Sequence, residues 1–250
     1  MNKLFLLILS LFVVLISTAS PADSLQKANE AYAANEFEKA VSLYESILDS
    51  GYESSELYFN LGNAYYKSNQ LPKAILNYER ARLLNPKDED IQFNLELANQ
   101  FVVDKIEALP RPFLAKWGNS LVNTFTSNQW AFTSIASFVL MLTLALVYLL
   151  SRRIGFRKLA FALSIVFLLI SIASFVFSYQ QKNKIIQHNH AIIFNPTVTV
   201  KASPDDSGTD LFVIHEGLKV SIEQKLDNWV EIKIEDGNSG WIKNEVMEEI

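Results

Sequence analysis

The sequence predicts a multi-domain chain in which an all-α solenoid of repeats is followed by a two-helix transmembrane hairpin and a small all-β barrel. Three observations support this fold class. Residues 23–109 repeat with a period of 34, residues 130–150 and 159–177 are uncharged apolar runs, and residues 191–250 alternate apolar with polar side chains. Charge follows the same division, because 110–184 contains no acidic residue while both flanking parts are acidic.

Residues 1–22 have the plan of a secretory signal peptide. Lys3 precedes an apolar run that is too short to span a bilayer, and small residues follow it, with a preferred cleavage site after Ala22. An uncleaved anchor helix is the alternative. The chain has no cysteine, which excludes disulfides, thiol catalysis and a cysteine-linked lipid anchor.

Residues 23–109 contain a repeat of aromatic and small residues. Phe59-Asn60-Leu61 recurs 34 residues later as Phe93-Asn94-Leu95. The best unit, residues 55–88, has these marks: Tyr58, Leu61, Gly62, Tyr65, Ala74, Tyr78, Ala81 and Pro86. This pattern resembles the tetratricopeptide repeat, in which two helices form each unit. Residues 23–54 form a weaker unit, and 88–108 supply a last first-type helix that we interpret as a cap.

The first helices of such a stack line its concave side, where partners bind. The resemblance therefore implies a partner-binding groove, and its amides could bond to an extended peptide backbone. The candidate groove residues are Asn29, Phe59, Asn60, Asn63, Tyr66, Lys67, Phe93 and Asn94. In the alternative interpretation, the asparagines bond to neighbouring turns and contact no ligand.

The apolar runs at 130–150 and 159–177 are each long enough to cross a hydrocarbon core. The turn between them, residues 151–158, carries Arg152, Arg153, Arg157 and Lys158, which the positive-inside rule places in the cytoplasm. Both soluble parts are then expected on the periplasmic, extracytoplasmic side of the inner (cytoplasmic) membrane. Residues 110–129 are predicted to form an interfacial helix, with a plain linker as the alternative, and 178–190 a linker.

Residues 191–250 contain five short runs with strand periodicity, separated by turn residues such as Asp236-Gly237. The order Glu216-Gly217, Trp229-x-x-Ile232 and Gly240-Trp241-Ile242 resembles bacterial SH3-like (SH3b) domains. Trp229 shares parity with polar residues and is a candidate platform for a peptide or cell-wall ligand. A plug at the barrel end is an equal alternative for Trp229, and Trp241 is expected in the core.

The order of these parts, together with the segment SGTDLFVIHEG (207–217), resembles the BatE-type proteins of the aerotolerance (Bat) operon. The resemblance covers essentially the whole chain. It implies a membrane-anchored envelope protein whose partners are Bat von Willebrand A-domain proteins and a MoxR-type ATPase system.

Composition and motifs argue against several other functions. Neither soluble part has the clustered cations that nucleic-acid binding needs, since residues 23–109 hold 8 basic against 15 acidic residues and 191–250 hold 5 against 12. No phosphate-binding loop, nucleophile motif or completed metal-ligand set appears, so we expect neither an enzyme nor a cofactor. The favoured function is a membrane-anchored scaffold that binds protein partners and membrane lipid. The alternative is a peptidoglycan-binding envelope protein.

Overall fold

The computed structural model describes residues 21–107, 109, 112–187 and 189–250. The predicted signal peptide lies outside the described residues except for Pro21 and Ala22, where the first described helix begins. The chain divides into two compact units, Met1–Glu53 and Ser54–Ile250.

The first unit is a helical hairpin, α2 (Pro21–Ala33) and α3 (Phe37–Asp49). Ala28 and Ala40 are both fully buried, and their small side chains allow the two helices to lie close together. Asn35 takes a positive φ of 60° in the turn, a conformation that asparagine tolerates better than most residues. The unit that departs most from the repeat pattern therefore still forms a complete helix pair.

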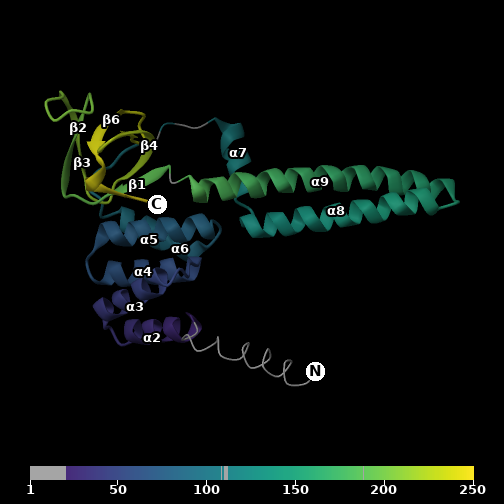
Figure 1. Cartoon of the computed structure of the whole chain (residues 1–250), viewed down its shortest axis with the longest axis horizontal. Coiled ribbons are helices and arrows are strands. Elements are labelled where there is room, and N and C mark those ends of the chain that lie inside the picture. Colours follow the sequence, from purple (N-terminus) through teal and green to yellow (C-terminus); the bar gives the residue numbers. More distant parts are fainter. Residues whose placement is uncertain (1–20, 108, 110–111, 188) are drawn as a thin grey trace, which may run out of the picture. The chain divides into compact units, whose positions relative to one another are not determined.

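The second unit begins with three more helices, α4 (Ser55–Lys67), α5 (Leu71–Leu84) and α6 (Glu89–Asn99), which are labelled in Figure 1. The hydroxyl of Ser54 accepts a hydrogen bond from Leu57 N–H and starts α4. Gly62 allows α4 to approach α5, because a Cβ at this position would lie 2.7 Å from ring atoms of Tyr78. The helix pair predicted from the sequence is confirmed. The repeat pattern has glycine at position 62 because the two helices are in close contact there.

Helix α6 ends the repeats because its outward positions are polar. Each residue of α6 corresponds to the residue 34 positions earlier in α4. The positions that bury Tyr58, Gly62 and Tyr65 against α5 are occupied in α6 by Gln92, Glu96 and Asn99, which are all exposed. Such a surface has no apolar stripe on which another helix could pack.

After α7 (Phe113–Val122), two long helices form an antiparallel hairpin, α8 (Ser127–Leu150) and α9 (Ile154–Ile186) (Figure 1). Both are long and apolar enough to cross a membrane by length and composition. Both also extend beyond the predicted apolar runs. The residues added to α9 include Arg157, Lys158, Lys182 and Lys184. Arg and Lys are good helix formers, so the charges that end the second apolar run do not end α9.

Reciprocal serine contacts join α8 to α9. The hydroxyl of Ser134 donates to the carbonyl oxygen of Ser171 at 2.9 Å, and the hydroxyl of Ser171 donates to that of Ser134 at 2.9 Å. Seven residues away on each helix, Ser127 and Ser178 repeat this exchange at 3.1 and 2.9 Å. These small side chains bring the two backbones together and satisfy their own hydroxyl groups.

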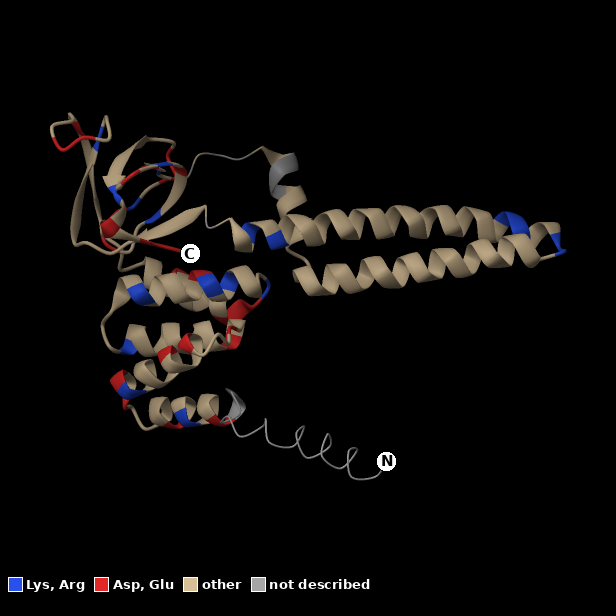
Figure 2. Ribbon diagram, viewed as in Figure 1, with Lys and Arg blue, Asp and Glu red and all other residues tan. Residues whose placement is uncertain are grey.

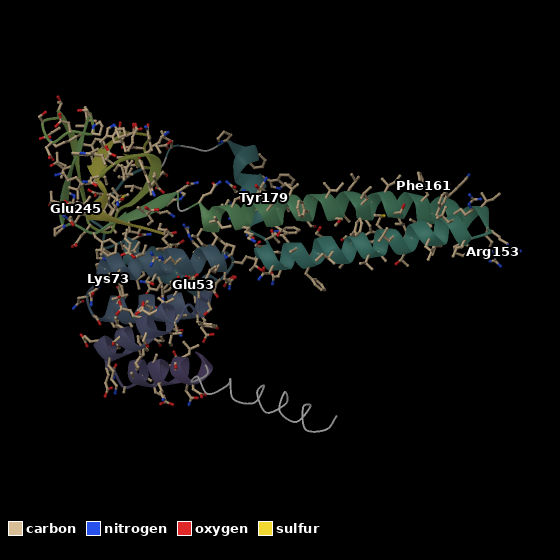
Figure 3. The ribbon with its side chains drawn as sticks, in the orientation of Figure 1. Glu53, Lys73, Arg153, Phe161, Tyr179 and Glu245 are labelled. Atoms are coloured by element: carbon tan, nitrogen blue, oxygen red, sulfur yellow. The ribbon has the colours of Figure 1, made fainter. Side chains whose placement is uncertain are left out.

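The basic turn is shorter than predicted. Only residues 151–153 separate the two helices, so Arg157 and Lys158 lie in the first turns of α9. Figure 2 shows basic residues at this tip, and Figure 3 places Arg153 there, at the opposite end of the hairpin from Tyr179.

The carboxyl-terminal part is a seven-stranded antiparallel sheet with the order β3-β2-β6-β5-β4-β1-β7. Its strands are β1 (His190–Ile193), β2 (Thr197–Lys201), β3 (Asp210–His215), β4 (Lys219–Leu226), β5 (Trp229–Lys233), β6 (Ser239–Lys243) and β7 (Met247–Glu249). The five predicted runs correspond to β2–β6. β1 and β7 were not predicted, and β1 begins at the last residue of the segment predicted to be a linker.

The core of this sheet is formed by the alternate residues that the sequence indicated. Val200, Val230 and Ile232 are at most 1% exposed. The expectation that Trp241 belongs to the core is wrong, because Trp241 is only half-buried. Its register partners, Glu231 and Lys201, lie on the outward side of their strands, opposite in parity to the buried valines.

The sheet packs against the repeat helix α5 through a buried ion pair. Lys219 Nζ lies 2.8 Å from Glu79 Oε2, and the Glu79 side chain is 5% exposed. Burial of Glu79 raises its pKa, but the charges and hydrogen bonds of Lys219 and Arg82 outweigh this and hold the pKa below its usual range. Burial lowers the pKa of Lys219, and Glu79 opposes that change. Arg80 adds a bond to the carbonyl oxygen of Glu249 at 2.7 Å.

The segment after α6 makes a second connection to the sheet. Asp104 accepts the backbone N–H of His215 at 2.7 Å, and the Leu109 N–H donates to the carbonyl oxygen of Glu235. Gly217, at a φ of 82°, lies against Val102. The helices α4–α6 and the sheet, which the sequence treats as separate domains on either side of the hairpin, therefore share one packed unit.

Candidate functional site

The predicted groove residues lie on α2, α4 and α6, where the repeat pattern uses some of them as internal contacts. In the first unit, the hydroxyl of Tyr44 donates to Asn29 Oδ1 at 2.6 Å. In the second unit, the hydroxyl of Tyr78, 34 residues later, donates to Asn63 Oδ1 at 2.8 Å. Each repeat therefore ties its first helix to its second through the same tyrosine–asparagine bond.

Asn63 is the centre of a small network between α4 and α6. The same Oδ1 that accepts from Tyr78 also accepts from the Asn94 Nδ2 at 2.8 Å. One of the two N–H donors of the Asn94 side-chain amide is therefore used in a hydrogen bond within the protein. Asn63 and Asn94 thus bond to side chains on helices of the repeats, whereas the alternative interpretation expected bonds to neighbouring turns.

Aromatic rings lie beside this network. Phe59 on α4 contacts Tyr78, with ring centroids 6.0 Å apart, and Tyr66 contacts Phe101 edge-on at 6.3 Å. Phe59 and Tyr66 are half-buried, and Lys67 at the end of α4 is exposed. The predicted residues of α4 thus form a surface of rings and amides that retains some solvent access.

Phe93 differs from its counterpart Phe59, although both occupy the same repeat position. Phe59 packs on a ring of the second helix of its own unit. Among the described residues no second repeat helix follows α6, and the next helix, α7, begins only at Phe113. Phe93 is accordingly 65% exposed. This ring is therefore exposed at a position where the preceding repeat covers its own ring, which makes Phe93 a candidate contact for a partner.

Phe101 belongs to this surface and was missed by sequence reasoning. It is 61% exposed and directly follows α6, where it contacts Tyr66. The repeat pattern contains no equivalent position in which to look for it. The available signal was a single aromatic residue just past the end of a polar helix. We refer to Phe59, Asn60, Tyr66, Phe93 and Phe101 as the aromatic groove, after the groove that the repeat resemblance predicts on this side of the helices.

Trp229, the candidate on the sheet, is half-buried on the outward side of β5, as its parity predicted. The Lys243 Nζ lies 5.7 Å from the centroid of its ring, within cation–π range. The hydrogen bond and charge of Asp206 raise the pKa of Lys243. The Trp229 indole therefore lies next to the Lys243 ammonium group, which Asp206 keeps in place through an ion pair.

The four basic residues of the hairpin tip are all exposed. The Arg157 guanidinium lies 5.2 Å from the ring centroid of Tyr148, and Arg153 lies 6.0 Å from that of Phe156. No ion pair involves these cations among the residues that the structure describes. They lie at the opposite end of the hairpin from Tyr179, as Figure 3 shows, and take no part in the aromatic groove.

Comparisons with known proteins agree with the helical architecture of the amino-terminal part. Residues 25–90 match the family model described as Tetratricopeptide repeat. Over 94 residues, 38% of this chain, the sequence is 32% identical to Tetratricopeptide repeat protein 28 of Mus musculus and of Homo sapiens. The match spans 4% of those much longer relatives. The amino-terminal region thus contains tetratricopeptide repeats, which generally bind protein partners.

Proposed function

We propose that this protein is a non-enzymatic scaffold, anchored in the inner membrane by α8 and α9, that holds a protein partner in its aromatic groove. Phe93 is the observation that supports this most directly. Its side chain is 65% exposed, and no second repeat helix follows α6 among the described residues. Exposed aromatic side chains beside a fixed network of amides are the usual anchors of a peptide or helix.

The contacts between α5 and the sheet support the proposed arrangement in the membrane. The repeats precede the hairpin and the sheet follows it, yet Glu79 and Lys219 form a buried ion pair. Such a contact requires both soluble parts to lie on one side of a bilayer that the hairpin crosses. The signal peptide and the basic tip favour the extracytoplasmic side.

The finer parts of the proposal rest on resemblance. The sheet is proposed to be an SH3b domain with a ligand near Trp229, and the whole chain to be a BatE-type component of a Bat stress-response complex. Its protein partners would then be von Willebrand A-domain proteins and the MoxR-type ATPase system. Peptidoglycan binding by the SH3b domain is the second candidate, favoured by the half-buried indole beside Lys243.

The groove is tested with full-length protein purified in mild detergent, because α5 and the sheet are packed together. Phe93→Ala and Asn60→Ala are compared with Glu96→Ala, which changes an exposed polar residue of α6 that is not part of the aromatic groove. Proteins recovered from membrane extracts by each variant are quantified by mass spectrometry. We expect a defined set to be retained by wild type and Glu96→Ala and lost from the groove variants. Equal recovery by all of them would rule out the groove.

Purified sacculi distinguish the second candidate. The full chain and a Trp229→Ala variant are sedimented with sacculi in detergent. Retention of the wild type together with loss of the variant would favour wall binding by the sheet. The scaffold proposal expects neither protein to be retained.

A further inference from the structure

The two edges of the carboxyl-terminal sheet differ in how they are protected. At the β7 edge, Arg80 of α5 donates to the carbonyl oxygen of Glu249 at 2.7 Å and to Glu248 at 3.1 Å. At the β3 edge, the described part of the chain supplies no further strand, and β3 pairs with β2 alone. One edge is thus covered by a helix, while the other presents an unpaired strand.

A single hydrogen bond shows which backbone groups of β3 point away from β2. The N–H of His215 donates to Asp104 Oδ2 at 2.7 Å, which places this N–H on the side away from β2. Backbone groups of an antiparallel ladder alternate in direction, so Val213, two residues earlier, also directs its N–H and C=O outward. The Asp104 carboxylate occupies the acceptor position that the carbonyl oxygen of a neighbouring strand would take.

The side chains of β3 indicate that the core is incomplete at this edge. Phe212 points to the core side with its register partner Val200, yet Phe212 is half-buried while Val200 is fully buried. Leu211 and Val213 are 50% and 48% exposed. The strand contains no lysine or proline, which are the residues that commonly protect an exposed edge from pairing.

Acidic residues surround both ends of the strand. Asp104 lies at the carboxyl end of β3, and Asp210 begins the strand, close to the turn that holds Asp205 and Asp206. Lys201 pairs with Asp210 and Lys243 with Asp206, each at 2.9 Å, so the net negative charge comes from Asp104 at one end and Asp205 at the other. Hydrogen bonds from the backbone and hydroxyl of Ser207 lower the pKa of Asp205. The edge is therefore apolar in the middle and negatively charged at its ends.

We propose that the β3 edge binds an extended basic segment of a partner protein by strand addition. The backbone of the added strand pairs with Val213, its apolar side chains cover Phe212, and its cations lie near Asp104 and Asp205. Pairing with a second copy of this chain is disfavoured, because the two acidic edges would then face each other. This surface is separate from the aromatic groove, so either proposal can fail without the other.

The test uses the full-length protein in detergent and a fluorescent synthetic peptide of about eight residues in which lysine and valine alternate, a length that matches a typical strand. One control peptide carries glutamate in place of lysine, and another carries N-methyl groups on the backbone nitrogens of both valine and lysine, so that it cannot donate backbone hydrogen bonds. We expect the fluorescence anisotropy of the lysine peptide to rise when the protein is added, and that of the two control peptides to stay unchanged. Absence of that binding, or equal binding of the N-methylated peptide, overturns the proposal.

Two further measurements locate the binding site. Amide hydrogen exchange in the wild-type protein is expected to slow at Val213 when the lysine peptide is added, and unchanged exchange there overturns strand addition. Val213→Pro removes the outward N–H, whereas Val213→Thr keeps it. We expect a loss of affinity of about tenfold with proline and little change with threonine. Equal affinity of the two variants overturns the assignment, and Phe93→Ala serves as a control that leaves peptide binding unchanged.

Discussion

Replacing Lys219 with methionine tests whether the buried ion pair holds the sheet against α5. Lys219→Met keeps a side chain of similar length but leaves the Glu79 carboxylate, whose side chain is 5% exposed, with Arg82 as its remaining ionic partner. Breaking a buried pair on one side costs about 3–5 kcal/mol. Because Arg82 stays, we expect the free energy of unfolding to fall by about 2–4 kcal/mol.

A matched control lies in the same strand. Lys225 pairs with Glu249 at 2.7 Å, but both side chains are substantially exposed, at 52% and 33%. Lys225→Met should therefore cost at most about 1 kcal/mol. Urea unfolding of the full chain in detergent micelles, followed by tryptophan fluorescence, compares the two variants. The reasoning is refuted if Lys219→Met costs no more than Lys225→Met.

The pH dependence of the same pair gives a second check. The folded-state pKa of Glu79 is lowered, so its stabilising contribution is present above the ordinary value of 4.5 and is lost as pH falls through the folded value. In Lys219→Met, protonation at low pH relieves the poorly paired Glu79 carboxylate. The stability gap between wild type and Lys219→Met should accordingly narrow below about pH 4.5. A gap that widens on acidification would contradict the proposed electrostatics.

Three further outcomes are expected. Gly62→Ala should destabilise the repeats by about 1–3 kcal/mol, measured by thermal unfolding, because the new Cβ meets the buried Tyr78 ring at 2.7 Å. Changing Ser134 and Ser171 together to alanine should cost about 0.6–1.7 kcal/mol, measured by unfolding of the hairpin in detergent, with no loss at all contradicting the serine contacts. The chain has no cysteine, so Asn238→Cys should react with an impermeant maleimide on intact spheroplasts while Arg152→Cys should not, and the reverse labelling would refute the topology.

Local patterns in the sequence predicted the repeats, the hairpin and most strands. The 34-residue period and the apolar runs are properties of neighbouring residues, so they can be recognised without the fold. β1 and β7 were not predicted. β7 has only three residues, and β1, His190–Ile193, does not alternate apolar with polar side chains. Its three buried residues Ala191, Ile192 and Ile193 are consecutive, since β1 lies between β4 and β7 and also faces α5.

Contacts between distant residues could not be predicted in this way. Glu79 and Lys219 are 140 positions apart, and each by itself looks like a solvated charge on a helix or strand. The groove shows the same limit. Sequence spacing placed Asn63 and Phe93 on binding faces. Only the fold reveals that Asn63 accepts two internal hydrogen bonds, and that Phe93 remains 65% exposed because no second repeat helix covers it in the described part of the chain.

The buried pair between α5 and the sheet has a mechanical consequence. In a bilayer, a protein with a single crossing would transmit any pull on its outer domain through one polypeptide strand. Here the segment leaving α6 and the segment entering β1 both lead from the same packed unit into the hairpin. If the hairpin crosses a bilayer as proposed, traction on the packed unit would therefore be divided between α8 and α9. The serine contacts add hydrogen bonds that resist sliding of one helix along the other.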